Sequence, residues 1–232
     1  MRVLVPMEPL SNEVAAAVPA LRAIVKLGGS LARDTALLRW LSAIATAGEP
    51  RLVVPGGGPF ADAVRKLQPR LGFDDRVAHG AAILAMQQYA LVLAALEPRL
   101  VPVETESEIA AVAAAGRSAI WLPWSMVGRD PTIEPSWRIT SDSLALLIAT
   151  RLGVSELLLV KAAVLPEAPV ELEALTERGV LDEAFPGFAR NYPGRIRLAH
   201  LSELDALVKG GREPRRVGLP DDDALATLGW AG

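Results

Sequence analysis

The sequence contains no cysteine and only two histidines among its 232 residues. The lack of cysteine excludes disulfide bonds, thiolate zinc sites and catalysis by a cysteine nucleophile, and it is typical of proteins from reducing compartments. Aromatic residues make up only 5% of the chain, so aliphatic side chains have to fill most of any core. We therefore expect a cytoplasmic protein whose site is built from other residue types.

Long apolar runs and a large net charge are also missing. No uninterrupted apolar stretch reaches the ~20 residues that a membrane helix needs. The opening segment MRVLVPMEPLSNEV carries acids and prolines, whereas an export signal needs a basic start and a continuous apolar region. The net charge is only -3, which gives no general attraction to nucleic acid or anionic membranes. We expect a small-molecule substrate and no nucleic-acid or membrane partner.

Hydrophobic residues make up 51% of the chain, which is enough for one sizeable core. Apolar runs of strand length alternate with helical patterns, which predicts an α/β fold with a mostly parallel sheet covered on both faces. The predicted strands span residues 23–27, 51–54, 100–103, 118–122, 156–164 and 196–199. The predicted helices span residues 34–46, 60–67, 74–96, 105–115, 140–152 and 202–208.

Three regions organise the chain. Residues 1–20 are predicted to be an N-terminal extension, residues 21–210 a single domain, and residues 211–232 a weakly ordered tail. Pro102 favours an edge or terminal position for its short strand, because proline cannot donate a ladder hydrogen bond. The spacing from Thr105 to Glu108 is that of a capping box, which predicts a helix start.

Two glycine-rich loops follow the first two predicted strands. In the first loop, Lys26 precedes Gly28, Gly29 and Ser30, so backbone amides and one full positive charge can meet a phosphate. The second loop contains Gly56, Gly57 and Gly58 without a lysine, and its backbone amides can donate to a second anionic or polar group. Neither loop has the spacing of a P-loop or of G-x-G-x-x-G. The alternative is that both are ordinary turns, since glycine is common between strands and helices.

Other polar residues have both a functional and a structural explanation. Asp142 follows Thr140 and Ser141 at a helix start, where it is either a site residue or part of an N-cap cluster. Asp75, Arg76 and His79 are three and four residues apart, so they can face an acceptor together or form a solvated helix face.

Histidine and tryptophan residues outside these groups are assigned mainly structural roles. His200 follows a predicted strand and has no acidic partner at an informative spacing, so we interpret it as structural. Trp121, Trp124 and Trp137 flank a proline-containing loop. One of them can cover a ring-shaped substrate, and the alternative for all three is core packing or loop anchoring.

Three segments resemble the ordered signatures of the amino acid kinase superfamily, which includes acetylglutamate, aspartate and uridylate kinases. They are VKLGGSL at residues 25–31, VVPGGGPFADAVR at 53–65 and WRITSDSLALLIATRLG at 137–153. The strings HGAAILAMQQYA and SWRITSDS are most similar to the aminomethylfuran-methyl phosphate kinases of methanofuran-type cofactor synthesis.

The resemblance implies a three-layer α/β/α sandwich. It places the acceptor in the half formed by residues 21–125, and ATP with Mg²⁺ in the half formed by residues 126–210. The reaction it implies is in-line transfer of the γ-phosphoryl group to a phosphorylated small molecule, without a covalent enzyme intermediate. Lys26 would neutralise charge on the moving phosphoryl group, and Asp142 would orient lysine or magnesium-bound water. Relatives are commonly dimers or larger, so a homo-oligomer is expected.

The chain also departs from the family pattern. Many relatives have an acidic residue and a glycine after the strand that supports the nucleotide, whereas this chain continues from Lys161 into Ala162 and Ala163. Lys161 is the candidate for a second positive charge there. The glycine-lysine motif near the C-terminus of acetylglutamate kinases is also absent, which argues against an amino-acid acceptor, and Arg190 or Arg195 could compensate. Two hypotheses follow: an ATP-dependent kinase for a phosphorylated acceptor such as aminomethylfuran-methyl phosphate or uridylate, or a non-catalytic relative that binds a nucleotide or oxyanion.

Overall fold

The structure is a computed structural model that describes residues 18–165, 170–210 and 213–218. Its centre is an eight-stranded sheet with the order β3-β4-β2-β1-β5-β7-β8-β6. All neighbouring strands are parallel except β7 and β8, which are antiparallel. The strands are β1 (Ala23–Leu27), β2 (Arg51–Pro55), β3 (Val101–Val103), β4 (Ala119–Trp121), β5 (Glu156–Lys161), β6 (Val170–Glu171), β7 (Arg195–His200) and β8 (Arg215–Gly218). The predicted mostly parallel sheet is confirmed.

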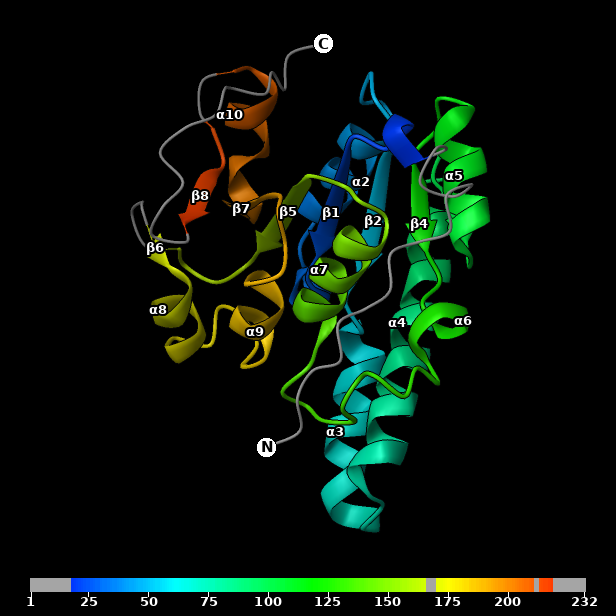
Figure 1. Cartoon of the computed structure of the whole chain (residues 1–232), viewed down its shortest axis with the longest axis vertical. Helices are drawn as coiled ribbons and strands as arrows, with labels where there is room; N and C mark the ends of the chain where they lie inside the picture. The colour runs from blue at the N-terminus through cyan, green and yellow to red at the C-terminus, as the bar shows by residue number, and fades with distance from the viewer. Residues whose placement is uncertain (1–17, 166–169, 211–212, 219–232) are drawn as a thin grey trace.

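Helices cover both faces of this sheet, which confirms the three-layer arrangement (Figure 1). The α-helices are α2 (Ala36–Ala45), α3 (Gly58–Leu71), α4 (Asp75–Leu96), α5 (Glu106–Ala114), α6 (Trp124–Val127), α7 (Ser141–Arg151), α8 (Leu172–Glu177), α9 (Phe185–Ala189) and α10 (Leu204–Val208). Short 3-10 helices are η1 (Val18–Ala20), η2 (Gly29–Arg33) and η3 (Leu201–Glu203).

The alternation of side chains along the strands divides the core into two layers. Val25 and Leu27 of β1 join the layer under α2, α4 and α10. Ile24 points to the opposite face and joins the layer under α5, α7, α8 and α9. Every residue of β1 is buried, as expected for a central strand covered on both sides.

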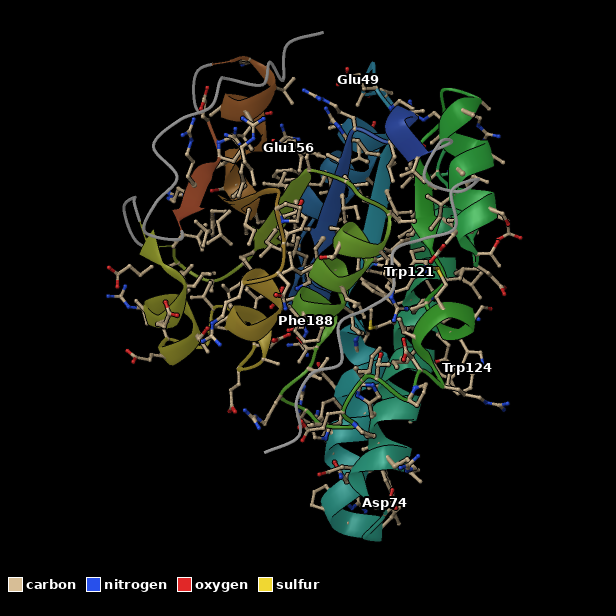
Figure 2. All side chains as sticks on the ribbon, in the orientation of Figure 1. Glu49, Asp74, Trp121, Trp124, Glu156 and Phe188 are labelled. Carbon is tan, nitrogen blue, oxygen red and sulfur yellow. The ribbon has the colours of Figure 1, made fainter. Side chains whose placement is uncertain are left out.

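Helices α3 and α4 form an antiparallel hairpin that projects beyond the carboxyl ends of the strands (Figure 1). Asp74 lies at the outer tip of this hairpin, while Glu156, at the start of β5, lies toward the opposite end of the molecule (Figure 2). Asp74 caps α4 by accepting a hydrogen bond from the backbone N–H of Val77 at 2.9 Å. The hairpin therefore projects from the same end of the sheet at which the glycine loops lie.

Helix α4 is long and apolar enough to cross a membrane by length and composition alone, and 44% of its most apolar window is buried within the structure. It packs against β2, β3, β4, α3 and α6. Its apolar character is thus partly explained by contacts with the core of this fold.

Most predicted elements are confirmed, with shifted ends. The capping box of Thr105 and Glu108 is present, and β3 is an edge strand as Pro102 predicted. Helix α3 begins at Gly58, earlier than predicted, and continues through Pro69 to Leu71. Strand β5 ends at Lys161, earlier than the predicted end at residue 164.

The carboxyl-terminal region departs more from expectation. The prediction of a weakly ordered tail is wrong for residues 215–218, because β8 pairs with β7, and Val217 contributes to the core. The pairing explains this order, since an antiparallel partner satisfies the backbone of β8. Strand β6 and helices α8 and α9 were not predicted. Residues 1–17, 211–212 and 219–232 of the predicted extension and tail lie outside the described residues.

Candidate active site

The two glycine loops contact each other at the carboxyl ends of β1 and β2. These strands are neighbours, with Leu27 paired to Pro55, and the Gly56 N–H donates to the Leu27 carbonyl at 2.8 Å. A Cβ atom at Gly29 would lie 2.4 Å from the Gly58 nitrogen, and one at Gly56 would lie 2.3 Å from the Gly29 nitrogen. Only glycine fits this approach, which brings the backbone of both loops to one place.

Lys26 and Lys161 share a single buried carboxylate beside these loops. The Lys26 Nζ lies 2.8 Å from Asp142 Oδ1, and the Lys161 Nζ donates to Asp142 Oδ2 at 2.6 Å. All three side chains are at least nine-tenths buried. The Lys26 ammonium is also 3.5 Å from the position of a Cβ atom built on Gly28. The structure therefore brings both predicted lysines, the glycine loops and the predicted aspartate together.

Strand register explains why both lysines reach the same carboxylate. Lys26 pairs with Leu159 of β5, and Lys161 is two residues farther along that strand, so the two lysine side chains emerge on the same face. This is the face of Ile24 and Leu159, which α7 covers. Asp142 lies in the first turn of α7 and meets both lysines from above the sheet.

The electrostatics of the cluster fix the charges of its members. Burial raises the pKa of the Asp142 carboxyl, but the charges of Lys26 and Lys161 outweigh burial and hold its pKa at about 2. Burial and the charge of Lys26 lower the pKa of Lys161 to about 8, although Asp142 acts in the opposite direction. The cluster thus holds two ammonium groups against one carboxylate at pH 7, which leaves an excess of positive charge.

The start of α7 is capped by a residue from a distant segment. Asp182, between α8 and α9, accepts hydrogen bonds from the Thr140 N–H at 2.9 Å, the Thr140 hydroxyl at 2.8 Å and the Ser143 N–H at 3.0 Å. The Ser143 hydroxyl also donates to Asp182. Because Asp182 performs the capping, the side chain of Asp142 is directed to the lysines and does not act as an N-cap.

A cavity of about 290 Å³ adjoins the glycine loops. Its walls come from both glycine loops, from α3 and α4, and from the segment that leads into α7. The lining residues are Gly29, Ser30, Gly57, Gly58, Ala61, Asp62, Arg65, His79, Ala82, Ile83, Met86, Ser136, Trp137, Ile139, Thr140, Ser141 and Leu144. Apolar side chains of α4 line the cavity together with the polar or charged side chains of Asp62, Arg65 and His79.

The three residues of α4 that were predicted to face the phosphoryl acceptor lie in different environments. His79 lines the cavity, whereas Asp75 and Arg76 are exposed and lie outside its lining. Asp75 instead accepts a hydrogen bond from Gln68 Nε2 at 2.7 Å. The physical reason is position along the helix: Asp75 is four residues, about 6 Å, closer to the hairpin tip than His79.

The other residues predicted for the glycine loops, and His200, differ in their position relative to the cavity. Ser30 and Gly57 line the cavity, whereas Gly56 lies behind it against Gly29. His200 ends β7 beside Lys161, and its ring contacts the Ser202 hydroxyl at 2.7 Å and the Ala162 carbonyl at 3.3 Å. These bonds fit the structural role predicted for His200.

Arg195 lies away from Lys161 and the glycine loops. It begins β7 and its Nε lies 2.6 Å from Glu156 Oε1, at the opposite end of the parallel strands from the glycine loops. Among the tryptophans, Trp121 is fully buried in the core, whereas Trp137 lines the cavity.

Sequence reasoning did not single out Asp182, Asp62 or Arg65. Asp62 and Arg65 lie four and seven residues after Gly58 in α3, a helical spacing that could have predicted a shared face with the second glycine loop. Asp182 left no comparable signal, because its contact with α7 joins segments 39 residues apart.

Comparisons with known proteins agree with this geometry. Residues 22–163 match the Amino acid kinase family. The chain belongs to the amino acid kinase family. It is 30% identical over 208 residues to a protein of Methanocaldococcus jannaschii named [5-(aminomethyl)furan-3-yl]methyl phosphate kinase, with 84% of this chain and 90% of the relative covered.

Solved structures of family members share the fold. The UMP kinase of Ureaplasma parvum superposes with a TM-score of 0.67 at 12% identity, over 86% of this chain and all of that one. The uridylate kinase of Archaeoglobus fulgidus gives 0.61 at 18% identity, over 85% and 100% of the two chains. Family membership and the named relative make this chain a phosphotransferase, and a non-catalytic relative is not favoured.

Proposed function

We propose that this amino acid kinase transfers the γ-phosphoryl group of ATP to a phosphorylated small molecule, and that the acceptor is an (aminomethyl)furanmethyl phosphate. The observation that carries the proposal is the cluster of Lys26, Asp142 and Lys161 beside two touching glycine loops. The acceptor is proposed from the relative in Methanocaldococcus jannaschii, whose name states that substrate.

The residues support in-line transfer by positioning and charge neutralisation. An oxygen of the acceptor phosphate would form a bond to the γ-phosphorus as the bond from that phosphorus to the bridging oxygen of ADP breaks. Lys26 and Lys161 would neutralise the transferring group, and the amides around Gly29 and Gly58 would hold its oxygens. Asp142 would keep the two ammonium groups in place before the phosphates arrive.

ATP and Mg²⁺ fit the donor set found at this centre. Among the described residues, no group of three or more His, Cys, Asp and Glu side chains could hold a metal ion. Asp142 already contacts one lysine with each oxygen. This arrangement suits Mg²⁺ carried mainly by nucleotide phosphates and water, as Mg²⁺ usually is in kinases; the ion would neutralise charge on the phosphates.

We also propose that the protein is a cytoplasmic homo-oligomer. Helix α4 exposes an apolar stripe of Val77, Leu84 and Leu91 at intervals of seven residues, which is the pattern of a helix face that packs against another surface. A second copy of the chain is the proposed partner. Sedimentation of wild type and of Leu84→Lys would test this: the proposal expects the variant to dissociate, and a monomeric wild type would contradict it.

A transfer assay tests the proposed reaction. ATP and Mg²⁺ are incubated with the protein and with [5-(aminomethyl)furan-3-yl]methyl phosphate or UMP, and ADP and the diphosphate product are measured. We expect transfer to the furan acceptor, and a loss of at least about 100-fold in kcat for Lys26→Ala, the size typical of losing one electrostatic group. Transfer to UMP alone would overturn the proposed acceptor, and full activity of Lys26→Ala would overturn the mechanism.

A further inference from the structure

The cavity extends outward along the α3–α4 hairpin from the glycine loops. Tyr89 of α4 lies beside Gly58, since a Cβ built there would be 3.2 Å from the ring, while Gln68 and Asp75 are hydrogen-bonded nearer the hairpin tip. Asp62 and Arg65 are four and seven residues beyond Gly58, or about 6 and 10 Å along the helix. An acceptor whose phosphate lies at the glycines therefore places its other end among the side chains of the hairpin.

His79 offers an unused hydrogen-bonding atom at this outer end. It lies seven residues, about 10 Å, before Met86 on α4, and both line the cavity. Its Nε2 is buried and has no hydrogen-bond partner among the described residues. Burial lowers the pKa of His79, while a hydrogen bond with the backbone of Ser136 raises it.

The ring of His79 can present a hydrogen-bond acceptor at this atom. Burial lowers the pKa of His79, which favours the neutral ring, and in a neutral imidazole one nitrogen carries the hydrogen and the other a lone pair. A ligand that donates hydrogens selects the tautomer with the lone pair on Nε2. A ligand group that donates hydrogens would satisfy this buried atom, whose isolation is otherwise unfavourable.

Asp62 adds a negative charge to the same wall. Its Oδ1 is 3.6 Å from Arg65 Nη1, which is longer than a hydrogen bond. Arg65 itself lies over the ring of Trp137, 4.3 Å from the ring centroid, and the Trp137 Nε1 donates to Gln68 Oε1 at 2.6 Å. Trp137 is thereby fixed as a wall, and the carboxylate of Asp62 is left able to accept hydrogen bonds from a second cation.

Asp62 is the one group of the described lining that can serve as counter-ion to a cationic ligand group; the other titratable side chains there are Arg65 and His79. Asp62 and Arg65 carry opposite charges and both are more than half exposed. Arg65 also lies over the Trp137 ring, so the Asp62 carboxylate keeps capacity for a second cation. The chain shows elsewhere that one carboxylate can hold two cations, because Asp142 contacts both Lys26 and Lys161.

We propose that the outer end of the cavity selects acceptors that carry an ammonium group, with Asp62 as its counter-ion and His79 Nε2 as a hydrogen-bond acceptor. This inference rests on the proposed kinase function and adds a specificity site to it. The acceptor class is an aminoalkyl phosphomonoester, with the phosphate at the glycine loops and the amine beside Asp62, about one helical turn along α3 from Gly58.

The test compares two acceptors that differ only in this group. [5-(aminomethyl)furan-3-yl]methyl phosphate and its hydroxymethyl counterpart are assayed with wild type, Asp62→Asn and His79→Phe. A charge-assisted hydrogen bond predicts that wild type prefers the amine by about 10- to 100-fold in kcat/KM. We expect Asp62→Asn to remove most of this preference by raising KM for the amine, with a smaller change for the hydroxymethyl acceptor. His79→Phe retains a ring and should reduce the preference severalfold.

Glu134→Gln is the matched control, because it removes one negative charge from an exposed residue in the segment before Ser136, outside the cavity lining. It should keep the wild-type preference. Equal use of both acceptors by wild type, or an unchanged preference in Asp62→Asn, would overturn the inference while leaving the kinase function intact. Transfer to neither acceptor would instead overturn the proposed function on which the inference depends.

Discussion

Lys161 donates a 2.6 Å hydrogen bond to Asp142, and both side chains are buried although they lie 19 residues apart. This pair joins the end of β5 to the first turn of α7, next to the strand that carries Lys26. It places a cation where the sequence lacks the acidic-glycine pair of many relatives.

The lowered pKa of Lys161 predicts a pH dependence of catalysis. In the free enzyme the ammonium loses its proton as the pH rises through about 8, so kcat/KM for ATP should fall above that pH. Bound phosphates favour the charged form and should move the corresponding decline in kcat to higher pH. In Lys161→Arg, whose guanidinium stays charged, the decline near pH 8 should disappear from the kcat/KM profile. The same decline in the variant would assign it to another group.

Removal of the Asp142 charge should affect stability as well as catalysis. Asp142→Asn leaves two buried lysines without a counter-ion, a change that typically costs about 3–5 kcal/mol of unfolding free energy. Denaturant unfolding at pH 7 measures this loss. An unfolding free energy equal to that of wild type would show that the lysines do not depend on Asp142.

The pH dependence of that loss has a defined sign. The folded-state pKa of Asp142 is about 2 and the ordinary value is 3.8, so the unfolded chain binds the proton more readily between these pH values. The stabilisation from Asp142 is therefore complete above about pH 4 and is lost as the pH falls toward 2. The difference in unfolding free energy between wild type and Asp142→Asn should shrink over that range, and a constant difference would contradict the lowered pKa.

The contact between the glycine loops predicts strong effects of single methyl groups. Gly29→Ala and Gly56→Ala each place a Cβ within 2.4 Å of a backbone nitrogen, so the two loops must move apart. Transfer activity should fall by about 100-fold or more, because a displacement of about 1 Å at a reacting centre has that effect. Gly48→Ala is the control, since its Cβ would meet nothing within 4 Å, and it should retain activity. Normal activity of the loop variants would show that the loops need not touch.

Asp182 should act through the position of α7. Asp182→Ala removes the acceptor for the Thr140 and Ser143 donors, and loss of a helix cap typically costs about 0.5–2 kcal/mol. Because α7 carries Asp142 in its first turn, kcat should fall as well. The neighbouring Glu183→Ala, which removes an exposed ion pair with Arg138, should change stability by less than about 1 kcal/mol. Equal effects of the two variants would refute a specific role for Asp182.

The sequence predicted the parts of this structure that local patterns determine. Strand β1 and the glycine loops follow from an apolar run and from adjacent glycines, and the start of α5 follows from the Thr105 and Glu108 spacing. Because β1 and β2 are parallel neighbours, the two loops that follow them lie at the same end of the sheet. The approach of Lys26 to Asp142 rested on the family resemblance, and the structure shows the contact directly.

Other features depend on tertiary contacts that a sequence pattern does not reveal. Whether Asp142 caps α7 or faces a lysine depends on Asp182, which belongs to another segment. Asp75 and Arg76 share a helical spacing with His79, but the cavity ends at the level of His79. Strand β8 is short and charged, and its order comes from pairing with β7.

A crystal structure with a non-hydrolysable ATP analogue, Mg²⁺ and the furan acceptor would show whether the two lysines and the glycine loops hold the transferring group. We expect the Nζ atoms of Lys26 and Lys161 both to lie within about 3.2 Å of oxygens of the γ-phosphoryl group, and amides of both glycine loops to donate to phosphate oxygens. A γ-phosphoryl group bound away from these loops, with both lysines still contacting only Asp142, would contradict this expectation.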